Sequence, residues 1–555
     1  MIQSARLTHA LLANAVFALI LHLWFRTHEP KTVLHPLSLM TMASLPSAFV
    51  IHSRGYIPLS AFLISAVTLN ATLALSILIY RLSPYHSLAR YPGPWQCRVS
   101  KLWLASFAWG GKTHEYIHKL HEKYGDIIRV GPNELSIRDV TLIPTTIGSL
   151  GMPKGPMWEG RRLLPTKNFN PNNSLTGVRD LRRHAVLRKP WDAAFKPSAL
   201  VPYEEMLLTR ADQFVKKLKE LLNTPEAEAD LSSWINRFTF DFMGDIAFGG
   251  TYSLLQDGDP NGILAGLKRA VFAPSVAQHI PWIQNALLAV PGIGKDTRTF
   301  GKFGVSQATK RYSMNDSMKY KDLFYYMLED LPPDQALPRL VSSSCLAIVA
   351  GSDTTSSVLS NIVYYLLREP KYLEQLRNEL DAAFGVVDAN GTIKLEALAS
   401  LPFLNAVINE ALRLQPPVPT GLQRAPARGS GGKQLSTEMY ISEGTNVLVA
   451  PYAFHRSPHY FFPKPEEFWP ERWIIKNPEI ILNRSAFIPF SNGPSSCPGK
   501  LLAMTELRYI TCLLFRTFDI KFAPEYNSSQ WEEELQDRFV LVKGSLPAVL
   551  SLRRK

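Results

Sequence analysis

Cysteine is scarce in this sequence. Its 555 residues include only four cysteines, at Cys97, Cys345, Cys497 and Cys512, and no two of them form a Cys-x-x-Cys pair. This number and scatter exclude a disulfide-stapled scaffold and a zinc site of the Cys-x-x-Cys type. The usage is typical of a reducing compartment, where a lone cysteine is either buried and inert or chemically used.

Concentrated basic runs are also absent. The 60 lysines and arginines exceed the 47 acidic residues by 13, yet no run of five or more basic residues occurs. Charge spread in this way usually belongs to a solvated surface, so the sequence argues against nucleic acid as a partner. An anionic membrane or an acidic protein partner remains compatible with the positive balance.

Long apolar runs, by contrast, fill the first eighty residues. They cover residues 7–25, 37–51 and 57–80. The third run holds no charge and exceeds the ~20 residues needed to cross a bilayer. The first spans only marginally, and the second is short and contains Pro46, which also suits an interfacial position. Because three runs in series argue against a cleavable signal peptide, we expect a membrane anchor with one to three transmembrane segments.

A proline-rich hinge follows the anchor. Tyr91-Pro92-Gly93-Pro94 cannot continue a helix, which places a boundary there. We therefore expect residues 1–90 to form the anchor and residues 91–555 to form the globular body. Four basic residues lie near this boundary, Arg81, Arg90, Arg98 and Lys101. By the positive-inside rule they place the body in the cytosol.

The pattern of the body predicts a mainly α fold with a small β portion. Its most regular feature is a long helix over residues 334–368, which Pro370 ends. Between residues 255 and 300 glycine and proline interrupt the pattern, so we expect only short helices and loops there. The other expected helices cover residues 112–124, 182–222, 370–385, 402–414 and 499–517, and the expected strands cover residues 127–131, 134–137 and 437–451.

The most informative segment runs from Phe490 to Gly499. Pro498 suits the first position of a helix, which places Cys497 at the N-cap, where unpaired backbone N–H groups and the helix dipole favour a thiolate. Gly493 and Gly499 let the backbone approach a flat object closely. A thiolate held in this way suits the axial position of a haem iron. The alternative is a buried cysteine that only caps a helix.

This segment resembles the cysteine loop of the cytochrome P450 family, Phe-x-x-Gly-x-Arg-x-Cys-x-Gly. Phe490, Gly493, Cys497 and Gly499 match the pattern. Ser495 stands where the family usually has an arginine or histidine that contacts a haem propionate. The resemblance covers roughly residues 90–550, and the further motifs follow in the family's order.

A second match lies in the long helix, at Ala350-Gly351-Ser352-Asp353-Thr354-Thr355. Small side chains at Ala350 and Gly351 leave room against the helix, and the Thr354 hydroxyl can bond to the carbonyl of Ala350 and open the helical ladder. Asp353 supplies a carboxylate for a proton relay. Alone, these residues also suit a Ser/Thr-rich core helix. Beside Cys497, they resemble the family's oxygen-activating groove, with Asp353 and Thr354 as its catalytic pair.

Two further sets of residues match family motifs. Glu410 and Arg413, three residues apart on one helical face, resemble the Glu-x-x-Arg pair that a later arginine, Arg472, completes as a structural triad. His184 and Arg188 resemble the family's Trp-x-x-x-Arg element. The resemblance implies that His184, Arg188 and Arg424 contact the haem propionates, and that these three residues carry the charge in place of Ser495.

The resemblance implies a cytochrome P450-like fold with an N-terminal transmembrane anchor, haem b bound through Cys497, and a fungal-type monooxygenase. Its electrons would come from NADPH through a separate NADPH–cytochrome P450 reductase. Its substrate would be a lipophilic small molecule, such as a terpenoid, contacted by residues 145–180, 262–290 and 416–422 and by residues near Gly544. The membrane would be that of the endoplasmic reticulum. Two alternatives stay open, a haem-thiolate peroxide isomerase or dehydratase and a non-catalytic haem-binding membrane protein.

Overall fold

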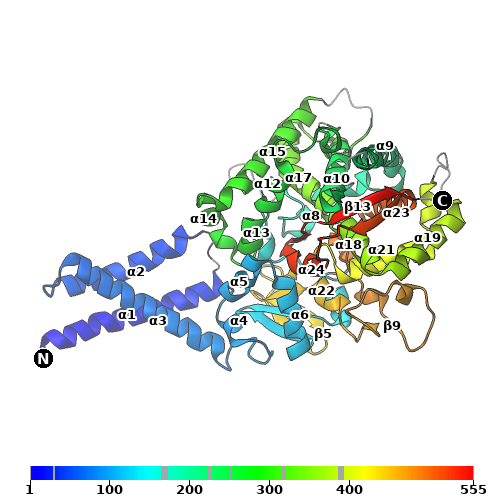
Figure 1. Cartoon of the computed structure of the whole chain (residues 1–555). Helices are drawn as coiled ribbons and strands as arrows, with labels where there is room; N and C mark the ends of the chain where they lie inside the picture. Colours follow the sequence, from blue (N-terminus) through cyan, green and yellow to red (C-terminus); the bar gives the residue numbers. More distant parts are fainter. Residues whose placement is uncertain are drawn as a thin grey trace.

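A computed structural model describes residues 2–28, 30, 32–163, 173–222, 228–250, 252–314, 320–329, 331–385 and 393–553. Three helices at the N-terminus project from the body as a bundle (Figure 1). They are α1 (Ile2–Thr27), α2 (Leu34–His52) and α3 (Pro58–Leu82). Each is long and apolar enough to cross a membrane. The second apolar run, which the sequence also allowed to lie at the membrane interface, forms a continuous helix of 19 residues with Pro46 inside it.

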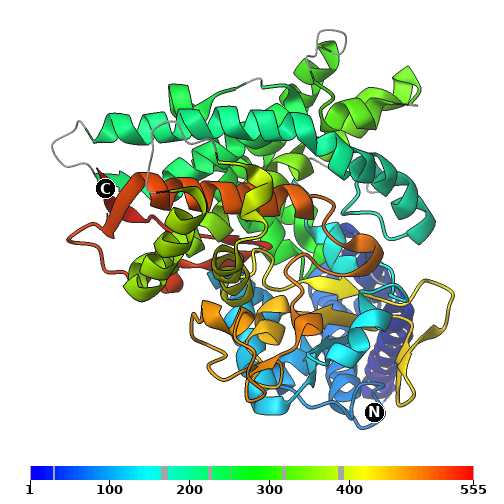
Figure 2. The same cartoon turned by 90° about the vertical axis from the view of Figure 1, so that its right-hand side faces the viewer.

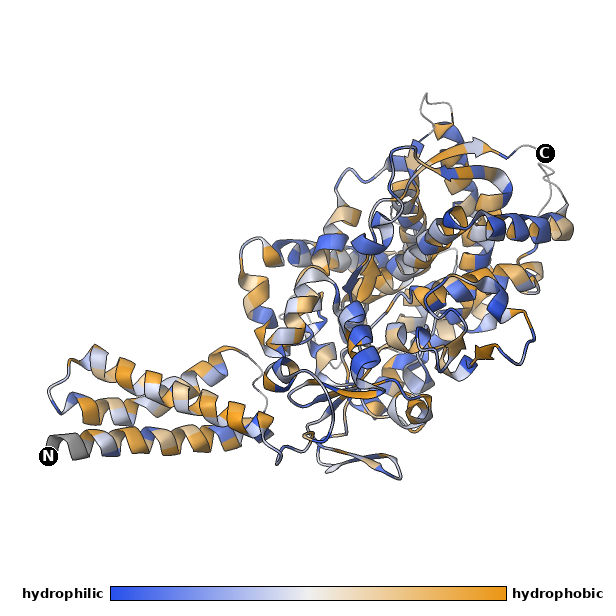
Figure 3. Cartoon of the chain, turned by 60° about the horizontal axis from the view of Figure 1, so that its bottom comes forward, coloured by the Kyte–Doolittle hydropathy of each residue, from blue (hydrophilic) through white to orange (hydrophobic). Residues whose placement is uncertain are grey.

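Hydrophobic residues predominate in the three helices of this bundle (Figure 3). Phe49 and Val67 are 74% and 64% exposed, which is unusual for such residues in water and ordinary in lipid. Polar contacts lie inside instead. The Asn14 amide of α1 donates to Ser65 Oγ at 3.1 Å and to Thr68 Oγ1 at 2.9 Å in α3. These bonds fix how the two helices pack, because a polar group that turned toward lipid would have no partner.

The body is helix-rich, as expected. Its longer helices are α6 (Thr113–Tyr124), α8 (Leu181–Ala194), α9 (Pro197–Leu221), α10 (Leu231–Phe248), α15 (Ile293–Ser313), α17 (Pro333–Ile348), α18 (Thr354–Arg368), α19 (Pro370–Phe384), α21 (Pro402–Leu414) and α23 (Lys500–Thr517). Shorter helices include α4 (Trp95–Val99), α5 (Leu102–Gly110), α12 (Ile263–Ala270), α13 (Phe272–Ala277), α14 (Gln284–Ala289), α16 (Leu323–Leu328), α22 (Pro451–His455) and α24 (Gln530–Glu534). In Figure 2 the orange-red α23 crosses the middle of the body beneath the teal α9.

One long helix was not predicted from the sequence pattern. Helix α15 begins at Ile293 and continues for 21 residues, where only short helices and loops were expected up to residue 300. Glycines inside it masked the pattern, and one of them has a packing role. A Cβ at Gly304 would lie 2.6 Å from Cys345 Sγ, so the glycine lets α15 pack closely against α17.

The strands form small sheets at the side of the helices. They are β1 (Ile127–Gly131), β2 (Glu134–Ile137), β3 (Glu228–Asp230), β4 (Leu422–Arg424), β5 (Gly432–Ser436), β6 (Met439–Ser442), β7 (Asn446–Val449), β8 (Phe461–Phe462), β9 (Ile481–Leu482), β10 (Phe518–Phe522), β11 (Gln536–Arg538), β12 (Val540–Val542) and β13 (Pro547–Leu552). The largest sheet has the order β1-β2-β7-β4, in which β2 and β7 run parallel. An isolated antiparallel bridge, Lys154 to Arg424, extends it at β4.

The expected long helix is present but is not uniform. Helices α17 and α18 are joined by a π-helical segment, Val349–Asp353, and together they cross the core. Their buried side chains belong to the largest hydrophobic cluster, which also takes in α10, α21 and α23. This π-helical segment overlaps the Ala350–Thr355 motif. Such segments are frequent at functional sites.

Candidate functional site

The loop before α23 presents Cys497. Its backbone is held by two hydrogen bonds, Ser496 N–H to Gly493 O and Cys497 N–H to Phe490 O, each at 2.9 Å. Gly493 has φ +67°, and a Cβ there would lie 2.4 Å from the carbonyl carbon of Gly148. Only glycine fits this position. The loop therefore packs its backbone directly against the segment around Gly148.

Cys497 does not occupy the N-cap, which corrects the sequence expectation. Helix α23 begins at Lys500 and its cap is Gly499, two residues beyond the cysteine. Pro498 therefore lies outside the helix rather than at its first position. Burial raises the pKa of the Cys497 thiol, while the Gly499 N–H, Arg188 and Lys500 act in the opposite direction. A coordinated metal cation would outweigh the burial, because it deprotonates a thiol that ligates it.

Cys497 differs from the other three cysteines in its surroundings. Its side chain is exposed, whereas Cys97, Cys345 and Cys512 are buried. Because burial nevertheless raises its pKa, protein surrounds this accessible sulfur. Ala350 is likewise exposed, although it lies in the middle of a helix that crosses the core. An accessible sulfur enclosed by the fold fits a ligand to a bound group better than it fits an inert capping residue.

The π segment has the hydrogen bond that the motif predicts. Thr354 Oγ1 donates to Ala350 O at 2.6 Å, and Ser352 Oγ donates to Ile348 O at 2.7 Å. A Cβ at Gly351 would lie 2.0 Å from Met243 Sδ, so α10 packs directly against the widened turn. Burial raises the pKa of Asp353 to about 6, and Lys543 acts in the opposite direction. This carboxyl is therefore able to exchange a proton near neutral pH.

The three residues of the expected structural triad are brought together. Glu410 is fully buried and accepts hydrogen bonds from Arg413 at 2.9 Å and from Arg472 at 3.0 Å. Trp469 N–H and Trp473 Nε1 each donate to the same carboxylate at 2.9 Å. The two tryptophan donors were not expected from the sequence. Burial acts to raise the pKa of Glu410, but the two arginines hold it below its ordinary value.

The expected cations gather near the cysteine loop. His184 and Arg188 lie on α8 and Arg424 lies on β4. Arg188 Nη1 donates to Ser496 O at 2.5 Å and to Pro494 O at 3.4 Å, so this arginine contacts the loop itself. Burial lowers the pKa of Arg424 to about 10. Burial also lowers the pKa of His184 to about 3, with further contributions from Lys154, Arg188 and Arg424.

Lys154 is the member of this cluster that sequence reasoning missed. It is 7% exposed, and its ammonium donates to Leu175 O at 2.5 Å. No local motif marks it, because only the bridge to β4 brings it beside Arg424. A haem with its two carboxylates fits this set of residues. The accessible sulfur of Cys497 suits a ligand to the iron, the small side chains at Ala350 and Gly351 leave room for the ring, and the buried cations suit the carboxylates.

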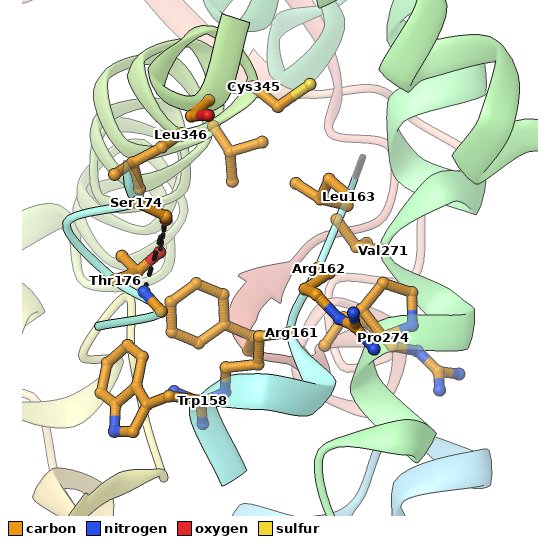
Figure 4. Close-up of a pocket in the computed structure, with 15 residues that line it drawn as sticks. Trp158, Arg161, Arg162, Leu163, Ser174, Thr176, Val271, Pro274, Cys345 and Leu346 are labelled. Carbon is orange, nitrogen blue, oxygen red and sulfur yellow. Dashed lines mark hydrogen bonds between the residues drawn. The ribbon is translucent and has the colours of Figure 1, made fainter. Parts of the chain in front are cut away.

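A separate pocket lies beside α17 (Figure 4). Its lining includes the apolar residues Trp158, Leu163, Val271, Leu346, Val349 and Phe539, and also three arginines, Arg161, Arg162 and Arg538. Two of the expected substrate-contact ranges, 145–180 and 262–290, contribute to it. Residues 416–422 and Gly544 are not among its described lining residues. Ser342, Cys345 and Leu346 of α17 and Val349 of the π segment line the pocket but were not expected.

Residues 90–549 match the family model for cytochrome P450. The chain belongs to the cytochrome P450 family and is a monooxygenase of that family. It is 34% identical to cytochrome P450 monooxygenase notG' of Aspergillus versicolor over 88% of this chain and 87% of the relative. It is 31% identical to cytochrome P450 67 of Uromyces fabae, over 94% and 95%. It is also 31% identical to tryprostatin B 6-hydroxylase of Neosartorya fischeri, over 88% and 86%.

Proposed function

We propose that the chain is a membrane-anchored haem-thiolate monooxygenase that oxidises a lipophilic small molecule with molecular oxygen. The single observation that carries this proposal is the accessible Cys497 sulfur, enclosed by the fold in a loop whose backbone is fixed by Gly493. When bound, a haem with a thiolate ligand supplies the activation of oxygen. The chain's residues hold the group, exclude water and move protons.

Each site residue has a role in this proposal. Cys497 would ligate the haem iron, and Phe490, Gly493 and Gly499 would shape its loop. Ala350 and Gly351 would leave space beside the π segment. His184, Arg188 and Arg424 would contact the propionates, and Asp353 and Thr354 would form the proton relay. Glu410, Arg413 and Arg472 would hold the scaffold of the cysteine loop through the buried bonds described above.

The pocket supports a lipophilic substrate. Leu163, Val271 and Leu346 line it together with two aromatic rings, which favour apolar groups of a ligand, while the three arginines of the lining would suit a polar group on the same molecule. One relative, from the fungus Neosartorya fischeri, is named tryprostatin B 6-hydroxylase. We propose that this chain hydroxylates or otherwise oxidises a lipophilic secondary metabolite.

We further propose that residues 1–90 anchor the protein in the endoplasmic reticulum membrane and that residues 91–555 face the cytosol. The three apolar helices support the anchor. Electrons would come from NADPH through NADPH–cytochrome P450 reductase, since the family commonly depends on a redox partner. Purified full-length protein, incubated with reductase and a range of lipophilic compounds, should consume NADPH and oxygen and yield oxidised product.

The same assay separates the alternatives. A peroxide isomerase or dehydratase would convert a lipid hydroperoxide without NADPH, reductase or oxygen. A non-catalytic haem-binding protein would show the haem spectrum but convert neither class of substrate. Turnover that depends strictly on NADPH and oxygen supports the proposal, and turnover without them contradicts it.

Replacing Thr354 by alanine should uncouple the enzyme. The hydroxyl that bonds to Ala350 O would be lost, proton delivery would be impaired, and NADPH would be consumed with hydrogen peroxide released instead of product. The measurement is the ratio of product to NADPH consumed, with peroxide assayed in parallel. Thr354→Ser keeps a hydroxyl and should retain most of the coupling. An unchanged ratio in Thr354→Ala would remove Thr354 from the relay.

Deleting residues 1–80 should release most of the protein from membranes. The three helices suited to a bilayer would be gone, while every residue proposed to hold the haem lies beyond residue 91. The measurement is the fraction of protein in the supernatant after centrifugation, with the haem spectrum recorded on that fraction. A folded truncated protein without the haem spectrum would contradict the boundary drawn at residue 91.

A further inference from the structure

Lys154 and Arg424 lie directly opposite each other across an antiparallel bridge. The flanking bonds are Gly155 N–H to Gln423 O at 3.2 Å and Ala425 N–H to Pro153 O at 3.0 Å. The bridge is thus a non-hydrogen-bonded pair, the type in which the two side chains share a face and lie closest. Both residues are buried, at 7% and 2% exposure. Two like charges in this arrangement repel each other.

No acid compensates this pair in the described part of the chain. None of the ion pairs found there involves Lys154, His184 or Arg424, and Arg188 pairs only with Asp192, whose side chain is 57% exposed. Burial holds the pKa of Lys154 well below its ordinary value, and Arg424, Arg188 and Arg161 lower it further. Buried cations without a counter-charge are strongly disfavoured, so an anionic ligand bound here would stabilise the cluster.

Arg188 is already engaged elsewhere. Its guanidinium bonds to Pro494 O and Ser496 O, the carbonyls on either side of Ser495, and to Asp192 Oδ1 at 2.6 Å. Ser495, at the loop position that usually carries a cation, is neutral, and Arg188 bonds to the backbone of the loop on either side of it. Among the described residues of this cluster, Lys154 and Arg424 form no ion pair with an acid, and they lie opposite each other at the bridge to β4.

We propose that Lys154 is a haem-propionate ligand that supplies the positive charge missing at Ser495. This assignment rests on the proposed binding of haem. The bridge to Arg424 makes the two side chains a paired cationic site for one carboxylate, and the bond from Lys154 to Leu175 O uses only one of the three ammonium N–H groups. Haem binding would return the pKa of Lys154 toward its ordinary range, because an adjacent carboxylate favours the charged amine.

The first test compares haem retention in full-length holoproteins. Lys154→Met keeps length and apolar volume but removes the charge, Lys154→Arg keeps the charge, and Lys189→Met removes an exposed lysine beside Arg188 as a matched control. The rate of haem transfer to excess apomyoglobin should rise at least on the order of tenfold in Lys154→Met. It should stay near the wild-type rate in Lys189→Met and in Lys154→Arg. Wild-type haem retention in Lys154→Met would overturn the proposal.

The second test distinguishes a propionate ligand from a merely structural lysine. Adding Ser495→Arg to Lys154→Met should restore haem retention, because it returns a cation to the loop. The haem reduction potential of Lys154→Met should be more negative than that of the wild type, since a positive charge near the haem favours the reduced form, and the double variant should recover it. Faster haem loss with an unchanged potential and no rescue by Ser495→Arg would overturn the proposal. A wild-type protein without a thiolate-type spectrum would instead refute the proposed function.

Discussion

Replacing Cys497 by serine is expected to abolish the thiolate-type Soret band of the reduced carbon-monoxide complex. A serine hydroxyl does not ionise near neutral pH and is a poor substitute for a thiolate donor. The loop geometry should survive, because it depends on the backbone bonds at Cys497 N–H and Ser496 N–H and on Gly493 rather than on the sulfur. Monooxygenase activity should fall with the spectrum.

The matched control is Cys512→Ala. Cys512 lies in α23 close to the loop in sequence, but its thiol is buried and burial raises its pKa to about 12, as expected of an inert cysteine. This variant should keep the wild-type Soret position. If Cys497→Ser showed the thiolate-type band as well, another residue would be the ligand and the function proposed here would lose its main support.

Replacing Glu410 by glutamine is expected to destabilise the body severely. The side chain keeps its size, but Arg413 and Arg472 lose the carboxylate that neutralises them while both remain fully buried. Removing one partner of a buried ion pair typically costs ~3–5 kcal/mol, and here two arginines share the partner. We expect a lower midpoint of urea unfolding and a protein recovered mainly without haem.

Glu467→Gln is the matched control for this prediction. Glu467 lies near the triad, but its side chain is 63% exposed and pairs with an exposed lysine, so its loss should cost at most ~1 kcal/mol. A pH dependence provides a second check. Because the folded pKa of Glu410 is lowered, its contribution to stability is present above its ordinary value of 4.5 and is lost as the pH falls through the folded value. Equal unfolding midpoints in the two variants would contradict the structural role.

The sequence was most informative where function depends on residues close together in the chain. The cysteine loop, the Ala350–Thr355 motif and the Glu410–Arg413 pair are local patterns, and the structure shows the geometry expected within the last two of them. The N-cap position of Cys497 was mispredicted because Pro498 is equally compatible with the residue before a cap. Proline alone does not say where the first helical turn closes.

Features that depend on contacts distant in sequence could not be predicted in this way. Lys154 looks like any loop lysine until a bridge places it opposite Arg424. Likewise, the tryptophan donors to Glu410 come from a segment far along the chain. Helix α15 was missed because the glycine that lets it approach α17 also weakens its helical pattern. In each case a packing contact, rather than local preference, selects the residue.

The end of α3 is joined directly to the body, and this would affect how the proposed anchor holds the enzyme at a membrane. Arg81 Nη1 at the last turn of α3 donates to Val99 O in α4 at 2.6 Å, and the Asn14 bonds hold α1 against α3. Hydrogen bonds, and not only the connecting chain, thus link the body to the helical bundle. In a membrane the body would therefore turn together with the bundle, so the tilt of the three helices in lipid would set which faces of the body meet the bilayer and which meet water.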